Sequence, residues 1–455
     1  MDLDVLTDSA PTEVGSYFVA NYPPFSAWSS EYVPAALKML ESPAENRWLG
    51  QVEHGPSQCE SGPPSLGLYI HIPFCRKRCK FCYFRVYTDK NSRDVEEYVD
   101  ALAREIALYA DRVRFRDRQF EFVYFGGGTP SFLSNDQLKR LVERINKTWR
   151  WDAAREVTFE CEPGTLKKSK IETIKSIGVT RISLGLEHFD DEVLELNGRA
   201  HKTAEIRRAF QWIREVGFAQ VNVDLIAGMV GDTDDKWEQA VEKTLALEPD
   251  SLTVYQMELP HNTVFSQETR DAGGQSPVAD WATKRRWANH AFEQFEAAGY
   301  VLSSGYTLVK PSPHAGFAYR DSLWHGADMI GTGVASFSHV GGVHYQNFDQ
   351  WGDYVAAVGR GELPLARALP MTDRQRLIRE LILQLKLGKI DAGYFRDKFA
   401  VEIRDEFADA WRSLDREACV EFAGDEIRLT RPALLRVDGL LPRFFEPQFR
   451  GVRYT

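Results

Sequence analysis

The stretch "HIPFCRKRCKFCYF", residues 71–84, places three of the chain's six cysteines within eight positions. Cys75, Cys79 and Cys82 come directly after "LGLYIHI", residues 66–72, an apolar and β-branched run that is typical of a buried strand. A loop at the carboxyl end of a strand can bring such thiols together. Basic residues fill the gaps between the cysteines and favour ionised sulfur. The sequence therefore predicts that these three cysteines bind a metal centre.

Two kinds of metal centre accept thiolate ligands of this type, zinc and iron–sulfur. A structural zinc site normally has four protein ligands, and the only candidates for a fourth are Cys59 and His71, at spacings that match no zinc motif. Three thiolates favour instead an iron–sulfur cluster in which one iron is free to bind an exogenous ligand. Zinc, or an inert cluster, is the alternative that the spacing leaves open.

Further strand-like runs alternate with helical patterns after this first strand. The strand-like runs are residues 120–125, 156–162, 181–187, 220–228 and 251–259. Segments with helical periodicity are 94–109, 135–148, 203–216 and 235–247. Alternation of this kind gives parallel strands joined by right-handed crossovers, so we expect an α/β fold with a partial or full parallel (β/α) barrel. Active-site groups should lie where its strands end.

The length of 455 residues predicts one large domain and at least one smaller addition. We expect a loop-rich lead-in at residues 1–65, the barrel domain at 66–365 and a C-terminal helical or winged module at 366–455. The helical pattern "TDRQRLIRELILQLKLG", residues 372–388, begins this module, and "EIRLT", residues 426–430, is a strand candidate within it.

Composition excludes several classes of protein. With 43% hydrophobic and 27% charged residues, the chain is neither disordered nor fibrous. Its formal net charge of -10 gives no general attraction to nucleic acid. No apolar run approaches the length of about 20 residues that a membrane span needs, and the acidic start is unlike a secretion signal. We expect a cytoplasmic protein with no nucleic-acid partner and no membrane span.

Four more segments recur together with the C-x3-C-x2-C spacing in a known family. They are "YIHIPFC" at 69–75, "YFGGGTPS" at 124–131, "GVTRISLGLEHFDDEVL" at 178–194 and "VNVDLIAGM" at 221–229. In order and spacing the chain resembles the oxygen-independent coproporphyrinogen III oxidase group of the radical S-adenosylmethionine (SAM) superfamily. That group also includes haem chaperones and radical C-methyltransferases. The resemblance is strong over residues 66–360 and looser over the tail.

The resemblance implies a cofactor role for the three cysteines. In this family such cysteines hold a [4Fe–4S] cluster whose fourth iron binds SAM, so Cys75, Cys79 and Cys82 would hold the cluster here. One electron cleaves SAM, and the resulting 5'-deoxyadenosyl radical removes a hydrogen atom from the substrate. The protein supplies binding, orientation and the exclusion of water. By position in the motifs, the further residues implied to contact SAM are Tyr69, Phe81, Phe84, Gly126, Gly127, Gly128, Thr129, Glu160, Glu187, Arg199 and Asp224.

Each of these residue types also has an ordinary structural interpretation. Glycine is the default turn residue, although the segment 126–130 follows a strand and resembles the family's site for the methionine part of SAM. Tyr69 can be a core aromatic, and Phe81 and Phe84 can simply cover the cluster. The charged residues can form ion pairs at the rim of a barrel. "MIGTGVASFS", residues 329–338, is typical of a small-residue strand and turn, and equally resembles the family's glycine-rich segment near a second pocket.

The function that the resemblance implies is SAM cleavage followed by hydrogen abstraction from a tetrapyrrole or aromatic substrate. Oxidative decarboxylation of coproporphyrinogen III, a step of porphyrin biosynthesis, is the first expectation. Radical C-methylation and haem trafficking are the alternatives, because Glu187 replaces the usual glutamine and Phe84 replaces a cysteine of the true oxidases. The implied cofactors are the cluster, one SAM molecule or two, and in the chaperone case haem. The implied electron donor is a low-potential protein such as flavodoxin or ferredoxin.

Overall fold

The structure is a computed structural model that describes residues 10–16, 19–44, 63–274 and 276–452. Cys59, one of the two candidates for a fourth ligand, lies outside these residues, as does much of the predicted lead-in. In the part of the chain that is described, no helix is long and apolar enough to cross a membrane.

A twelve-stranded sheet forms the centre of the fold, in the order β12-β11-β10-β9-β1-β2-β3-β4-β5-β6-β8-β7. The strands from β9 through β1 to β6 run parallel to one another. Their bounds are β1 Leu66–Ile72, β2 Phe120–Gly127, β3 Glu156–Cys161, β4 Arg181–Glu187, β5 Gln220–Ala227, β6 Ser251–Gln256 and β9 Asp328–Thr332. All six predicted strands are thereby confirmed.

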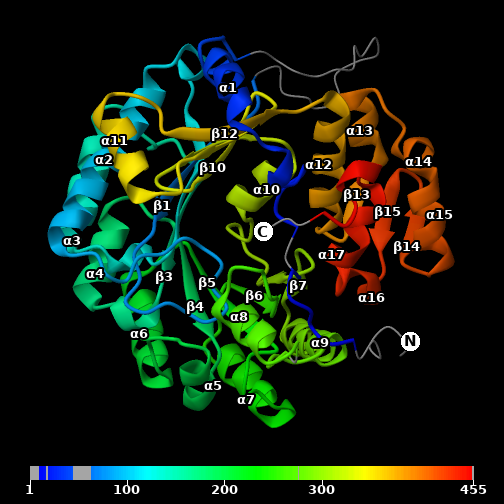
Figure 1. The fold of residues 1–455 in the computed structure, drawn as a ribbon. Coiled ribbons are helices and arrows are strands. Elements are labelled where there is room, and N and C mark those ends of the chain that lie inside the picture. The colour runs from blue at the N-terminus through cyan, green and yellow to red at the C-terminus, as the bar shows by residue number, and fades with distance from the viewer. Residues whose placement is uncertain (1–9, 17–18, 45–62, 275, 453–455) are drawn as a thin grey trace.

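The parallel strands curve into a partial barrel with helices on the outside (Figure 1). The sheet has two edges, β12 and β7, and none of the strand ladders among the described residues joins them. The outer helices are α2 Ser92–Ala110, α3 Asn135–Asn146, α4 Lys168–Ser176, α5 Asp191–Leu196, α6 Thr203–Val216, α7 Asp234–Leu245 and α9 Trp281–Ala297. The predicted α/β fold with a partial parallel barrel is therefore confirmed.

Strand β1 shows why the two faces of this sheet differ. Successive side chains of a strand point to opposite faces. Leu68, Ile70 and Ile72 are fully buried in the apolar core beneath the outer helices. Tyr69 and His71 alternate with them and hydrogen-bond to each other, Tyr69 Oη to His71 Nδ1 at 3.3 Å. The outer face is therefore apolar, and the inner face carries polar groups.

Antiparallel strands extend the sheet at both edges, which the sequence interpretation did not include. These strands are β7 Val301–Leu302, β8 Thr307–Val309, β10 Phe337–Val340, β11 Val343–Asn347 and β12 Leu365–Pro370. Gly341 and Gly342 connect β10 to β11 with positive φ angles of 58° and 76°. Two such residues allow a tight hairpin turn, which glycine adopts without strain. The remaining barrel-side helices are α8 Val264–Asp271, α10 Ala318–Trp324 and α11 Trp351–Gly359.

The C-terminal part has its own apolar core and a three-stranded antiparallel sheet in the order β13-β15-β14. Its elements are α12 Asp373–Leu385, β13 Lys389–Asp391, α13 Ala392–Phe399, α14 Ile403–Glu406, α15 Ala408–Arg416, β14 Val420–Ala423, β15 Glu426–Leu429, α16 Arg431–Leu434 and α17 Val437–Leu440. The predicted boundaries at residues 65 and 365 stay predictions, and β12 of the large sheet runs across the second one.

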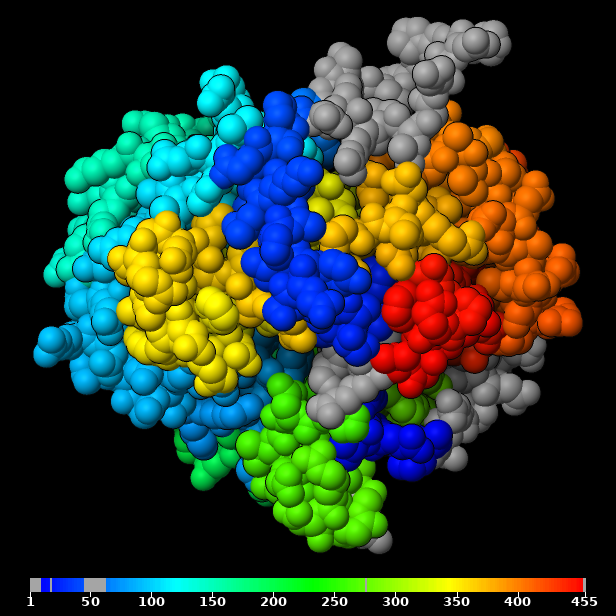
Figure 2. All heavy atoms as spheres, turned by 45° about the horizontal axis from the view of Figure 1, so that its top comes forward, coloured from blue at the N-terminus to red at the C-terminus, as the bar shows by residue number. Residues whose placement is uncertain are grey.

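The N-terminal residues lie against both parts of the molecule. Residues 19–44, which include helix α1 (Val33–Leu40), cross the face between the sheet extension and the C-terminal end (Figure 2). Ser29 forms a backbone bridge to Ala368 in β12. Tyr22 is fully buried, and its ring lies 4.9 Å from that of Phe445. This segment therefore fastens the C-terminal module to the barrel.

Candidate active site

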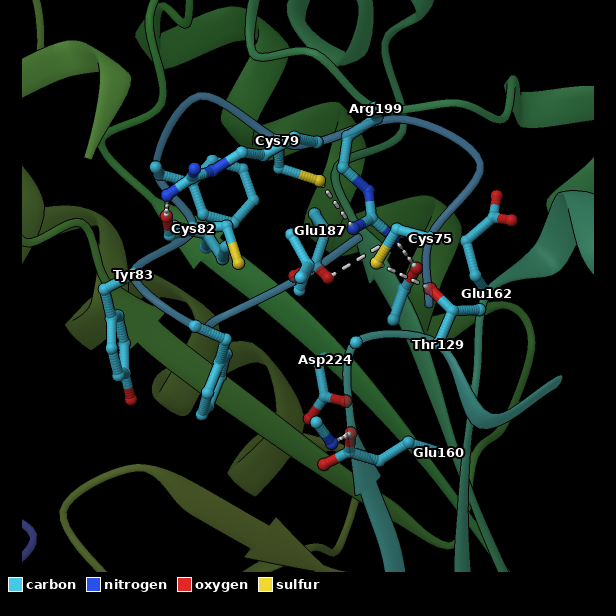
Figure 3. Close-up of a pocket in the computed structure, with 18 of the residues that line it drawn as sticks. Cys75, Cys79, Cys82, Tyr83, Thr129, Glu160, Glu162, Glu187, Arg199 and Asp224 are labelled. Carbon is cyan, nitrogen blue, oxygen red and sulfur yellow. Dashed lines mark hydrogen bonds and ion pairs between the residues drawn. The ribbon is translucent and has the colours of Figure 1, made fainter. Parts of the chain in front are cut away.

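The three cysteines lie on one loop between β1 and α2. The loop is closed by two backbone hydrogen bonds, from Cys75 N to Tyr87 O at 3.1 Å and from Tyr87 N to Pro73 O at 2.7 Å. Cys75, Cys79 and Cys82 all line a cavity of about 330 Å³ at the carboxyl ends of the parallel strands (Figure 3). The structure thus brings the three thiols to one wall of one cavity.

Burial, not the basic loop residues, dominates the electrostatics of these thiols. Desolvation raises the pKa of Cys75 to about 11 and that of Cys82 to about 12. A guanidinium from another segment also contacts one of these thiols, because Arg199 Nη1 donates to Cys79 Sγ at 3.3 Å. Arg78 of the loop lowers the pKa of Cys82, in the predicted direction, but burial has the larger effect. A bound metal centre would supply further positive charge.

The glycine segment after β2 packs directly behind the cysteine loop. Gly128 N donates to Ile72 O at 2.8 Å. A Cβ atom on Gly128 would lie 2.9 Å from the carbonyl oxygens of Ile72 and Phe74, and Gly127 has a φ of 110°. Only glycine permits this approach. Thr129 follows, and its hydroxyl lies 3.4 Å from Cys75 Sγ.

Half-buried carboxylates from three strands, Glu160 of β3, Glu187 of β4 and Asp224 of β5, line the same cavity. Glu160 accepts hydrogen bonds from Tyr124 Oη at 2.7 Å and from Gly127 N at 3.2 Å. Asp224 accepts from Ser183 Oγ at 3.0 Å. Desolvation raises the pKa of Glu160 to about 7 and also raises the pKa of Asp224. Carboxylates held in this way favour a cationic or hydrogen-bond-donating ligand, which restores the interactions lost on burial.

Glu187 reaches the cavity because β4 is irregular at its end. The pairing of β4 with β5 shifts register between Gly185 and Glu187, and Glu187 has a φ of 63°. Such irregularities turn a side chain toward a site. The Glu187 carboxylate lies 3.5 Å from Arg199 Nη2, which also donates to Gly185 O at 3.0 Å. Desolvation raises the pKa of Glu187 to about 7.

Most of the predicted site residues line this cavity, and two do not. Those that line it are the three cysteines with Phe81, Phe84, Gly127, Gly128, Thr129, Glu160, Glu187, Arg199 and Asp224. Tyr69 and Gly126 lie behind the wall, where the Tyr69 ring stacks on Tyr124 with centroids 5.8 Å apart. A Cβ atom on Gly126 would meet both of these rings. Direct cofactor contacts by Tyr69 and Gly126 stay predictions.

Sequence reasoning missed several residues of the cavity wall. Glu162 is the most connected, because its carboxylate pairs with Arg76 at 3.1 Å and with His201 Nδ1 at 3.0 Å. These pairs join the end of β3 to the cysteine loop and to the segment that carries Arg199. Tyr83, Ser183, Tyr255, Gln256 and Glu258 also line the cavity. The sequence signal that could have identified these residues was their position, since most of them lie at or just beyond the carboxyl end of a predicted strand.

Comparisons with known proteins agree with this geometry. The family described as "Radical SAM superfamily" matches residues 69–244. The "Heme chaperone HemW" of Haemophilus influenzae is 32% identical over 283 residues, which are 60% of this chain and 70% of that protein. The chain belongs to the HemN and HemW family of radical SAM proteins.

In other members of the family the match extends over more of the chain. The "Oxygen-independent coproporphyrinogen III oxidase" of Pseudomonas aeruginosa is 29% identical over 376 residues, which are 79% of this chain and 80% of that protein. The solved structure of coproporphyrinogen III oxidase (HemN) from Escherichia coli has a TM-score of 0.79 and 23% sequence identity. It covers 93% of this chain and 96% of that one, and shows that the two share their fold.

The cofactors of the radical SAM superfamily are a [4Fe–4S] cluster and SAM, and the residues of the cavity suit both. Three thiols on one wall leave one iron of a four-iron cluster without a protein ligand. Among the described residues, no group of three or more His, Cys, Asp or Glu side chains is placed to bind a single metal ion. A cluster needs a different arrangement, because each thiolate binds a separate iron. Glu160 and Asp224 offer acceptors for an amine or ribose hydroxyls, and Arg199 offers a donor.

Proposed function

We propose that this chain is a radical SAM enzyme that oxidatively decarboxylates a porphyrinogen propionate, as a coproporphyrinogen III oxidase does. One observation carries the proposal: Cys75, Cys79 and Cys82 line the same cavity as Glu160 and Asp224. When bound there, the cluster and SAM together supply an abstractor of single hydrogen atoms. The match to coproporphyrinogen III oxidases over four-fifths of the Pseudomonas aeruginosa protein supports this substrate.

The residues of the chain have separable roles in this proposal. The three cysteines hold the cluster, and the segment formed by Gly127, Gly128 and Thr129 lets backbone approach a small ligand closely. Glu160, Glu187, Arg199 and Asp224 bind and orient SAM. The closed loop and the buried strand ends exclude water, which strengthens each of these interactions.

The substrate step needs one further reactant, a one-electron acceptor. The propionate side chain loses one hydrogen atom to the abstractor, and its carboxyl group leaves as CO₂ when the carbon–carbon bond breaks. One electron passes to a one-electron acceptor, and a vinyl group remains. A low-potential donor such as flavodoxin or ferredoxin would supply the electron that cleaves SAM. Because free thiols and such donors belong to reducing compartments, we propose a cytoplasmic location.

A haem chaperone is the second candidate, favoured by one feature of the cysteine loop. The sequence Cys82-Tyr83-Phe84 matches the ending of the chaperones' cysteine motif. The rings of Tyr83 and Phe84 stack 4.5 Å apart at the cavity and are 39% and 40% exposed. Such a pair offers a flat apolar surface to a planar ring system. Bound haem and a second SAM molecule stay predictions.

Anaerobic reconstitution with iron and sulfide tests the proposal. The reconstituted protein is reduced with one equivalent of dithionite per cluster and then incubated with methyl-labelled SAM, coproporphyrinogen III and a one-electron acceptor. We expect 5'-deoxyadenosine and a vinyl product that carries no label. Label in the product would assign methyl transfer, and stable haem binding without substrate turnover would assign the chaperone function. Absence of 5'-deoxyadenosine from an iron-loaded protein would refute the enzyme proposal.

A further inference from the structure

A second cavity, of about 350 Å³, adjoins the cavity that the three cysteines line. Its lining combines residues 76–77 of the cysteine loop, Asp191 and Glu195 of α5, and the segment 199–202 that precedes α6. Residues 76, 77, 199 and 200 line both cavities. The two cavities therefore lie against the same part of the cysteine loop, and the second has no role in the proposed binding of SAM or substrate.

The lining of the second cavity is basic although the chain as a whole is acidic. Four of its side chains are lysines or arginines, and two, Asp191 and Glu195, are acidic. The formal net charge of the chain is -10. The Lys202 side chain is 62% exposed, and Lys77 is exposed and has no ion-pair partner among the described residues. A local basic surface of this kind attracts an acidic partner that the rest of the chain repels.

The segment that forms one side of this cavity packs directly on Cys79. Lys80 N donates to Asn197 O at 3.1 Å. A Cβ atom on Gly198, which has a φ of 79°, would lie 3.4 Å from the Cα atom of Cys79. Arg199 lines both cavities and donates from Nη1 to Cys79 Sγ at 3.3 Å (Figure 3). Backbone contacts and one hydrogen bond thus connect the second cavity to a proposed ligand of the cluster.

An ion-pair network holds the two sides of the cavity together. Arg76 Nη2 of the loop donates to Glu162 at 3.1 Å and to Ala200 O at 3.3 Å. His201, from the opposite side, hydrogen-bonds to the same carboxylate through Nδ1 at 3.0 Å. A surface that is already ordered loses little entropy when a partner binds to it.

We propose that the second cavity and its exposed lysines, Lys77 and Lys202, dock the acidic face of the one-electron donor protein. This rests on the proposed function, because SAM cleavage is what requires the electron. The cysteine-lined cavity of about 330 Å³ is too small to admit a protein, so the donor must approach the cysteine loop from outside. One electron leaves the donor and enters the cluster, and no atom is exchanged. The contact between Arg199 and Cys79 keeps this route short.

The test measures donor binding to cluster-loaded protein prepared anaerobically. The probes are two acidic electron carriers, a flavodoxin and a ferredoxin, and isothermal titration calorimetry at low and high salt gives the Kd of each. The variants are Lys77→Glu and Lys202→Glu. Lys139→Glu, exposed on α3, is the matched control because it changes the net charge equally. We expect donor binding to weaken about three- to tenfold in each cavity variant at low salt, less at high salt, and not in the control.

Cross-linking locates the bound donor independently of affinity. A carbodiimide joins a lysine amine to a carboxylate that contacts it, and mass spectrometry identifies the joined peptides. Donor peptides should be joined to Lys77 or Lys202. Cross-links confined to other lysines would overturn the proposal. So would equal donor affinity of both cavity variants and Lys139→Glu, or failure of both donors to bind the wild-type protein.

Dithionite separates the docking surface from the proposed function. It is a small reductant that needs no protein docking site, so Lys202→Glu should form 5'-deoxyadenosine normally with dithionite and more slowly with flavodoxin. If the wild-type protein binds donors through Lys77 and Lys202 but cleaves no SAM with either reductant, the surface stands and the proposed function fails. If it cleaves SAM while both variants bind donors normally, the surface is wrong and the function stands. Iron content and melting temperature show whether any loss reflects misfolding.

Discussion

Glu105 in α2 is fully buried and Glu160 in β3 is partly exposed, yet their acidity is equally perturbed. Burial raises the pKa of each to about 7. Glu105 lies among the outer helices, where it accepts from Gly333 N at 2.8 Å, Asn347 Nδ2 at 2.6 Å and Tyr354 Oη at 2.7 Å. Glu160 has two protein donors and faces a cavity.

We propose that this difference separates a structural from a functional carboxylate. A perturbed pKa alone marks both kinds of residue, because ion pairs and hydrogen-bond networks shift acidity wherever they are buried. The hydrogen-bond donors around each carboxylate, and whether it lines a cavity, distinguish the two kinds. Glu105 joins α2 to the loop after β9, to β11 and to α11, and its donors come entirely from the protein. Glu160 lines the cavity, and we propose that it binds a ligand there. The following predictions test this separation.

The largest effect is expected at the cysteines of the cavity. Cys75→Ala, Cys79→Ala and Cys82→Ala should each lose most bound iron and lower SAM cleavage by about a thousandfold or more, because three thiolates act as one set of ligands. Iron analysis and 5'-deoxyadenosine assays measure this. Cys419→Ala, in the core of the C-terminal module, is the matched control and should keep its iron. Full iron content in any cavity variant would contradict the ligand assignment.

Glu105→Ala should mainly affect stability. It leaves three buried donors without an acceptor, and we expect the free energy of unfolding to fall by about 3–5 kcal/mol, as for other disrupted buried networks. Urea denaturation of the cluster-free protein measures this. Glu105→Gln is the conservative control, because a rotated Asn347 amide can pair with it. If Glu105→Ala unfolds normally but loses SAM affinity, the structural assignment is wrong.

The stability of the cluster-free protein should also fall as the pH rises through Glu105's titration range. The ordinary pKa of a glutamate is 4.5, and the folded state raises it to about 7. Between these values the folded state holds a proton that the unfolded state has released, so this group's contribution to stability is greatest below pH 4.5 and decreases up to pH 7. For one group the decrease is about 3 kcal/mol. Unfolding curves of wild type and Glu105→Gln at pH 5, 6 and 7 give the difference, which should diminish in the variant.

The smallest free-energy effect is expected for Glu160→Gln. It should weaken SAM binding by about tenfold to a hundredfold, the cost of removing a charged acceptor, with the melting temperature changed by only a few degrees. Equilibrium dialysis with labelled SAM and thermal unfolding measure the two quantities. Glu105→Gln should show no loss of SAM affinity. A large loss of stability in Glu160→Gln would place this residue with Glu105 and remove the distinction.

The sequence predicted the parts of this molecule that depend on local pattern. The runs 66–72 and 203–216 were placed within a residue of β1 and α6, because apolar periodicity and flanking glycines are local signals. The spacing of the cysteines predicted which residues bind the metal centre. Side-chain direction was harder: alternation along β1 turns Tyr69 toward Tyr124, behind the cavity wall.

The pairing of strands that lie far apart in the sequence could not be predicted from any local pattern. β9 lies beside β1 although about 260 residues separate them in the chain. The segment "MIGTGVASFS", residues 329–338, contains no signal that identifies the strand with which it pairs. The Gln256 amide depends in the same way on its hydrogen bond to Leu435 O in the C-terminal module. Hydrogen bonds between distant segments create these features, and composition does not encode them.

The N-terminal segment sets the order in which the molecule can be completed during synthesis. Val19 N donates to Asp438, and Tyr22 Oη to Glu446, so this segment binds surfaces that are synthesised more than 400 residues after it. The barrel strands can form while translation continues. Residues 19–22 cannot dock until residues 438–446 have been synthesised, so a chain that stalls before them would leave this segment undocked.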